Sequence, residues 1–122
     1  MSDINIPKNG VLTKTVAYAS TTAGDQASAI ITGVAGKRIR IYAIGLSISI
    51  GGTNCFLRNG AGGTPVTETF LRTLSGSSFP AYYNRVGYQG IWLYESTAGS
   101  SIVLYCTTAA AQVSISIVYS FI

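Results

Sequence analysis

The fold class follows from residues 33–50, which read Gly33-Val34-Ala35-Gly36-Lys37-Arg38-Ile39-Arg40-Ile41-Tyr42-Ala43-Ile44-Gly45-Leu46-Ser47-Ile48-Ser49-Ile50. Valine, isoleucine and tyrosine favour β strands, and alternation of apolar and polar residues is typical of a strand buried on one face. The apolar positions change parity along the stretch, from Ile39, Ile41 and Ala43 to Ile44, Leu46, Ile48 and Ile50. A strand changes its buried face only through a bulge or bend. We therefore predict a long central strand that bends near Gly45, because glycine is common at such sites.

The rest of the chain also favours strands over helices. Short strands are expected at 11–19, 27–32, 54–58, 66–71, 79–84, 89–94, 102–106 and 112–122. The last of these is the clearest, because one parity holds Val113, Ile115, Ile117, Tyr119 and Phe121. Asn59-Gly60 is typical of a hairpin turn, and the Gly-rich residues that follow predict a loop longer than two residues. No segment shows a helical period with a cap. We predict an all-β chain, a single jelly-roll-like β-sandwich of about eight or nine antiparallel strands.

The chain length of 122 residues suits one domain. Residues 1–10 contain Pro7, Asn9 and Gly10 and have little periodicity, which predicts an extended N-terminal arm ahead of a β-sandwich at 11–122. The first residues lack the basic start and apolar run of a signal peptide, so we expect synthesis in the cytoplasm. Disulfides are rare in that compartment, which favours unbridged thiols at Cys55 and Cys106 over a bridge.

Charge is scarce in this sequence. Charged residues make up 10 % of the chain and apolar residues 48 %, against about a quarter charged in an average protein. A surface with so little charge favours an oligomer over a monomer rich in Ser, Thr and Gly. No apolar run approaches about 18 residues, so we expect no membrane span. Of the eight basic residues only Lys37, Arg38 and Arg40 lie close together, which predicts no nucleic-acid partner. Arg38 and Arg40 are expected on one strand face, either solvated or paired across an interface.

The side chains of the common enzyme sites are missing. There is no histidine, which removes the Ser-His-Asp and Cys-His arrangements and the usual imidazole metal ligands. The two cysteines lack zinc spacing, and a carboxylate pair would require distant residues such as Glu68 and Glu95. Residues 33–37 lack the first glycine and the Ser or Thr of a phosphate-binding loop. We expect no enzyme activity, no metal, no cofactor and no small-molecule substrate.

One group of side chains suits contact with a partner, namely the aromatic set Tyr82, Tyr83, Tyr88 and Trp92, with Tyr94 beside it. Tyrosine and tryptophan bury large areas at interfaces, and they also stack on sugar rings. The alternative is ordinary cross-strand packing, which we expect for at least half of them.

Several short motifs resemble small structural proteins of tailed bacteriophages, in particular head decoration (cement) proteins. The matching stretches, in order along the chain, are residues 34–41, 60–65, 80–88, 98–99 and 112–121. Each motif has low specificity alone, and their order and spacing carry the resemblance. The aromatic-rich stretch 82–94 departs from the family pattern and leaves room for a fibre or receptor-contacting role.

The resemblance implies a virion protein that assembles as a homotrimer on the capsid exterior and binds the major capsid protein where capsomers meet. In that setting, Ile4, Ile6, Pro7 and Lys8 of the arm are candidates for docking on the shell. Arg38, Arg40 and Tyr42 are candidates for a subunit or capsid contact. The alternative function is a carbohydrate- or receptor-binding module of a virion fibre or cell surface, which would use the aromatic set. A small β-sandwich enzyme is a third possibility, and the lack of histidine opposes it.

Overall fold

A computed structural model describes residues 12–50, 54–67, 81–87, 91–109 and 111–122. The predicted N-terminal arm, with Ile4, Ile6, Pro7 and Lys8, lies outside the described residues, and so do Tyr88 and most of the strand predicted at 66–71. Within the described ranges every regular element is a β strand, and no helix occurs. Consequently, no described segment is a helix long and apolar enough to cross a membrane.

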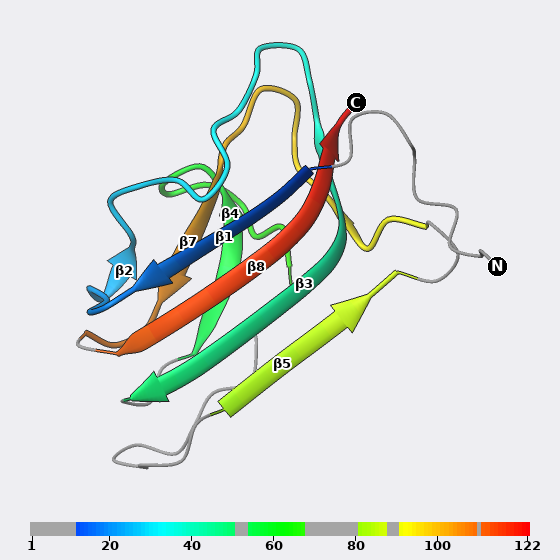
Figure 1. The fold of residues 1–122 in the computed structure, drawn as a ribbon. Helices are drawn as coiled ribbons and strands as arrows, with labels where there is room; N and C mark the ends of the chain where they lie inside the picture. Colours follow the sequence, from blue (N-terminus) through cyan, green and yellow to red (C-terminus); the bar gives the residue numbers. More distant parts are fainter. Residues whose placement is uncertain (1–11, 51–53, 68–80, 88–90, 110) are drawn as a thin grey trace, which may run out of the picture.

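The strands form two antiparallel sheets, one behind the other in Figure 1, in the manner of a β-sandwich. The larger sheet has the order β1 (Leu12–Tyr18), β8 (Gln112–Phe121), β3 (Ile39–Ile50) and β5 (Ala81–Val86). The short strand β6 (Tyr94–Glu95) also pairs with β3. The smaller sheet has the order β2 (Gly24–Asp25), β7 (Ile102–Cys106) and β4 (Cys55–Asn59). The all-β prediction is therefore confirmed.

The core lies between the two sheets and consists mainly of isoleucine and leucine. Burying each such side chain contributes roughly 1.5–3 kcal/mol, so the alternating strands are held with their apolar faces inward. The larger sheet contributes Ile39, Ile41, Ile44, Leu46, Ile48, Val113, Ile115 and Ile117, and the smaller sheet contributes Cys55, Leu57, Ile102, Leu104 and Cys106. These positions confirm the inward parity predicted for the last strand and the extensive burial predicted for 102–106.

The central strand changes its buried face as predicted, but at a different residue. The register of β3 against β8 shifts between Ile41 and Ala43, which places the bulge at Tyr42 rather than at Gly45. Gly45 lies in regular pairing with Asn84 on one side and Ser116 on the other. Ile41 and Ile44 are both buried, although a regular strand would place residues three positions apart on opposite faces. One extra residue between them, at Tyr42, lets both side chains face the core.

Two predicted strands are wrong in extent. Residues 27–32 form no strand beyond a single bridge between Ile31 and Ile102, whereas Gly24–Asp25, where no strand is predicted, forms β2. The strand predicted at 89–94 is reduced, among the described residues, to Tyr94–Glu95. In both places polar or glycine residues make short backbone pairings that no apolar alternation signals.

The two cysteines lie opposite each other in the smaller sheet, as unbridged and buried thiols. A hydrogen bond to Cys106 raises the pKa of Cys55 above its ordinary value of 9.0, and burial raises it further. Burial also raises the pKa of Tyr18 above 10.0, with a smaller contribution from the charge of Cys106. Both groups are therefore held neutral in the folded state over a wider pH range than in the unfolded chain.

This arrangement predicts alkaline instability. The folded state retains the Cys55 and Tyr18 protons above the pH at which the unfolded chain releases them, so stability is complete below pH 9 and falls as pH rises beyond it. Each group contributes a slope of up to about 1.4 kcal/mol per pH unit. Urea midpoints measured with reductant between pH 7 and 10.5 test this. Tyr18→Phe should lessen the decline, and an unchanged wild-type midpoint across that range would contradict it.

Candidate functional site

The strongest candidate site lies where β6 pairs with the beginning of β3. We call it the β3–β6 corner and define it by Arg38, Arg40, Trp92 and Glu95. Arg40 and Glu95 are direct cross-strand partners, and Arg40 Nε donates a hydrogen bond of 2.7 Å to Glu95 Oε2. Arg38 Nη1 lies 3.8 Å from Glu95 Oε1. Two arginines thus share one carboxylate, which leaves the corner with a net positive charge.

Trp92 completes the corner and brings together two sets that the sequence predicted separately. The guanidinium carbon of Arg40 lies 5.1 Å from the centroid of the Trp92 ring, within range of a cation–π contact. The predicted strand-face arginine and one member of the predicted aromatic set therefore form a single surface. Trp92 nevertheless remains 38 % exposed, so part of the ring is available to a partner.

Exposed apolar side chains extend this surface. Val86 is 65 % exposed and Ile91 is 63 % exposed. Val86 is the last residue of β5 and pairs with Ala43, directly after the β3 bulge, and Ile91 directly precedes Trp92. The backbone of Gly87, next to Val86, closely approaches the Ile91 carbonyl, which brings the two segments together. Exposed apolar side chains beside a tryptophan are typical of protein contact surfaces, because a partner can remove their apolar area from water. The corner therefore offers both an apolar contact and a positive charge.

Main-chain hydrogen bonds hold the segment that carries Trp92. Leu93 N donates to Ile41 O at 2.7 Å, and Ser96 N donates to Ile39 O at 2.9 Å. The buried Ser96 hydroxyl accepts a further hydrogen bond from Ile39 N at 2.8 Å. The segment is thus anchored to the β3 backbone on both sides of β6, which fixes Trp92 beside Arg40.

Tyr42 supports the corner from within. It was predicted to lie on a contact surface with Arg38 and Arg40, but the bulge makes it a buried residue with 4 % exposure. Its hydroxyl accepts a hydrogen bond from Ser120 Oγ at 3.2 Å, and its carbonyl accepts one from Gly87 N at 2.7 Å. In the isolated chain, Tyr42 therefore positions the backbone around the corner and offers little surface of its own.

The other predicted aromatic residues are placed elsewhere or lie outside the described chain. Tyr82 pairs with Ser47 and Tyr83 with Leu46, toward the beginning of β5, whereas Val86 at its end is opposite Ala43. Tyr82 precedes Val86 by four residues, which corresponds to about 13 Å along the strand at 3.3 Å per residue. The structure therefore separates Tyr82 from the corner, and for Tyr88 it describes no position.

A second polar and aromatic cluster, on the smaller sheet, was not predicted. The Phe56 and Tyr105 rings stack with centroids 4.8 Å apart, and the Arg58 guanidinium lies 4.9 Å from the Tyr105 ring. Arg58 also contacts Asp25 Oδ1 at 3.3 Å, and Asp25 Oδ2 accepts a hydrogen bond from Gly62 N at 2.9 Å. These contacts tie the loop after β4 to β2. Phe56 and Tyr105 are far apart in sequence, and only the register of β4 against β7 brings them together.

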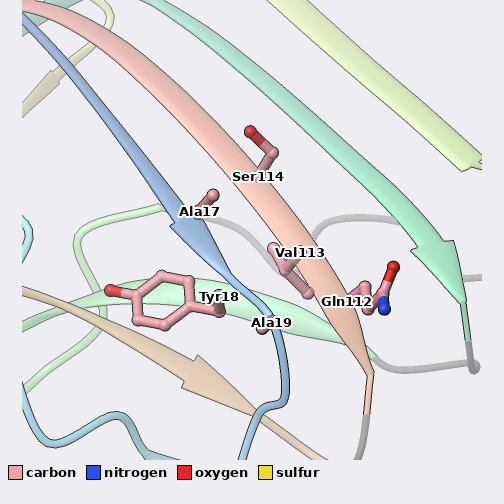
Figure 2. A pocket seen from close by; sticks show the side chains of 6 residues that line it. All are labelled: Ala17, Tyr18, Ala19, Gln112, Val113 and Ser114. Carbon is pink, nitrogen blue, oxygen red and sulfur yellow. The ribbon is translucent and has the colours of Figure 1, made fainter.

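A shallow hollow of about 290 Å³ lies between the end of β1 and the start of β8 (Figure 2). Its lining consists of Ala17, Tyr18, Ala19, Gln112, Val113 and Ser114. Tyr18 is the only ionisable residue among them, and its buried hydroxyl has no hydrogen-bond partner among the residues that the structure describes. Such a lining has no nucleophile–base pair and no metal-ligand set. Among the residues the structure describes, no group of three His, Cys, Asp or Glu side chains lies together as a metal site would require.

Comparison with known proteins leaves the family open. No protein-family model matches the sequence. The search of curated proteins likewise yields no match. The chemistry of the surface itself must therefore guide the functional assignment.

Removal of the carboxylate tests the electrostatics of the corner. In Glu95→Gln, we expect a loss of stability below about 1 kcal/mol, because the ion pairs are partly exposed to solvent and screened by salt. Trp92 is the only tryptophan of the chain, so its fluorescence reports directly on the corner and should change. Asp25→Asn is the matched control: it breaks the ion pair to Arg58 in the other sheet and should leave the emission unaltered. An emission change in the control alone would contradict this arrangement.

Proposed function

We propose that this chain is a viral structural protein, a capsid decoration (cement) protein that binds the outside of a phage head as a homotrimer. It would stabilise contacts between capsomers, after synthesis in the host cytoplasm. The observation that carries the proposal is the β3–β6 corner, where the exposed Trp92 ring contacts Arg40 within a group of net positive charge. The segments that carry the exposed Val86 and Ile91 lie close together beside it. The resemblance of several sequence motifs to phage head proteins supplies the class of partner, the major capsid protein.

The corner suits such a partner on physical grounds. An acidic and partly apolar capsid surface would match its positive charge and its exposed side chains, and the charge would favour correct orientation during encounter. Contact area that bridges two capsomers resists their separation, because binding stabilises only the assembled state. The low overall charge of the chain, 10 %, further supports the proposal that other subunits cover part of its surface.

The proposal includes a jelly-roll topology. Its support is the strand order, β1-β8-β3-β5 in one sheet and β2-β7-β4 in the other, in which the first strand pairs with the last and the second pairs with the last but one. A fourth strand of the smaller sheet would lie beyond β4. Residues 65–67 run beside β4 there, with Val66 N donating to Leu57 O at 2.7 Å.

Two measurements test the proposal together. The purified chain should have a native mass of about 38 kDa, three chains of 12.8 kDa each, and it should sediment with capsids of the virus that encodes it. Deletion of residues 1–10 should abolish that binding while preserving the fold, if the arm docks on the shell. A monomer that remains in the supernatant would contradict the proposal.

Carbohydrate binding is the second candidate function, and the exposed Trp92 ring favours it because tryptophan stacks on sugar rings. Retention on a glycan array that is lost in Trp92→Ala, with no binding to capsids, would assign this function instead. Retention that Trp92→Ala leaves unchanged would exclude the corner as the sugar site.

A further inference from the structure

The buried cysteine pair occupies a position that permits a covalent bond. Cys55 is the first residue of β4 and Cys106 the last residue of β7, and they are direct antiparallel partners. They lie 51 positions apart in the sequence, so only the fold brings them together. Both side chains are 0 % exposed, and they are present as thiols.

The hydrogen bonds of the ladder identify the type of pair. Thr107 N donates to Asn54 O at 3.0 Å, and Gly60 N donates to Ser101 O at 2.8 Å, so both of these pairs are of the hydrogen-bonded type. The two types alternate along an antiparallel ladder, which makes Cys55 and Cys106 a non-hydrogen-bonded pair. At such positions the Cα atoms are about 4.5 Å apart and the side chains lie closer together. That spacing falls within the range of about 4.4–6.8 Å that a disulfide requires.

The two thiols are already in mutual contact, because the Cys55 side chain is hydrogen-bonded to Cys106. Formation of a bond therefore requires a change in side-chain torsion and no change in the register of the strands. The pair is the last of the β4–β7 ladder and is followed by the hydrogen bonds between Asn54 and Thr107, so local opening from this end breaks those bonds before it reaches the cysteines.

We propose that Cys55 and Cys106 are a modification site, at which a low-molecular-weight disulfide converts the two thiols into a disulfide that bridges β4 and β7. One cysteine, as its thiolate, attacks a sulfur of the reagent, forms a mixed disulfide and releases one small thiol. The second cysteine then attacks the sulfur of the first and releases the other small thiol. The protein loses two hydrogens and two electrons, and the reagent is reduced to two thiols.

Burial sets the rate of this reaction. The hydrogen bond to Cys106 and burial raise the pKa of Cys55, so its thiolate is rare while the sheet is closed. Attack therefore requires local opening at the end of the ladder, and a reducing cytosol would keep the pair as thiols. An oxidising medium would convert it slowly and add a cross-link to the folded chain. This inference does not depend on the proposed capsid function.

Tyr18 is partly buried and packs against the core cluster that contains the pair. Its hydroxyl lies close enough to Cys106 for the charge of that residue to raise the pKa of Tyr18. The ring also lines the hollow between β1 and β8 (Figure 2). Removing the ring in Tyr18→Ala should therefore accelerate oxidation several-fold, whereas Tyr18→Phe, which keeps the ring, should not.

The test is to incubate the native chain with oxidised glutathione and measure its intact mass and melting temperature. We expect a mass loss of two hydrogens, a peptide that joins Cys55 to Cys106, and a rise of roughly 10 °C in melting temperature, because the cross-link closes a long loop. Dithiothreitol should reverse both changes. Cys106→Ser should form a glutathione adduct or remain unmodified, and its melting temperature should not rise on oxidation.

Three outcomes would overturn the inference. The first is that both thiols still react with iodoacetamide in denaturant after prolonged exposure to oxidised glutathione. The second is a stable double glutathione adduct, and the third is a disulfide between chains. If Cys106→Ser fails to fold, Cys55→Ala serves as the control, and the mass and peptide map of the wild-type chain decide the question alone.

Discussion

Gly87→Ala is expected to lower the free energy of unfolding by roughly 2–3 kcal/mol and to displace the β3–β6 corner. A Cβ atom at this position would overlap the carbonyl oxygen of Ile91 and would lie 3.2 Å from that of Tyr42. Both are backbone atoms, which cannot rotate away as a flexible side chain would. The segment that carries Ile91 and Trp92 must therefore shift, and the hydrogen bond from Gly87 N to Tyr42 O is strained at the same time.

Urea denaturation and the fluorescence of the single tryptophan measure this effect. Gly36→Ala is the matched control, because Gly36 has a φ of +75° but nothing within 4 Å of the added atom. It should cost roughly 1 kcal/mol from backbone strain alone and leave the emission unchanged. If Gly87→Ala has the same urea midpoint and emission as the wild type, the close approach of the Gly87 backbone to the Ile91 carbonyl is contradicted.

Trp92→Ala is expected to weaken binding to capsids about 30-fold or more, which corresponds to about 2 kcal/mol. Tryptophan at the centre of a contact surface commonly contributes this much, and the partly exposed ring is supported by Arg40 on one side. The fold should persist, because Trp92 lies outside the buried core cluster. Sedimentation with capsids over a concentration series measures the loss of affinity.

Two controls separate a contact from a general effect. Trp92→Phe keeps a ring at the site and should bind with intermediate affinity. Leu12→Ala removes another exposed apolar side chain, on β1, and should bind as the wild type does. Equal loss of binding in Leu12→Ala and Trp92→Ala would indicate non-specific adhesion through apolar surface.

Local pattern was enough to predict the class of fold and the clearest strands. Alternation placed Ile115 and Ile117 inward in β8, and the continuous apolar run at 102–106 predicted β7 at its observed bounds. The bulge lies at Tyr42 and not at Gly45, because the spacing of the buried apolar residues determines its position and the glycine does not. Ile41 and Ile44 are three positions apart and both face the core, so the extra residue of the bulge must be Tyr42 or Ala43.

The residues of the site are brought together by pairing between distant strands, and the local sequence pattern does not predict these pairings. Arg40 meets Glu95 and Trp92 only because β6 pairs with β3, across more than 50 positions of sequence. The stack of Phe56 on Tyr105 likewise depends on the register of β4 against β7. The concentration of aromatic residues at 82–94 indicates a contact role for Trp92, but it indicates neither of these two contacts.

Electron cryomicroscopy of capsids incubated with the purified chain tests the central claim most directly. We predict density on the capsid exterior at the junctions between capsomers, in groups of three copies, with Trp92 and Arg40 of the β3–β6 corner against the shell. Trp92→Ala should reduce the occupancy of these positions. Capsids with no added density, or with density in which the corner faces solvent, would contradict the account.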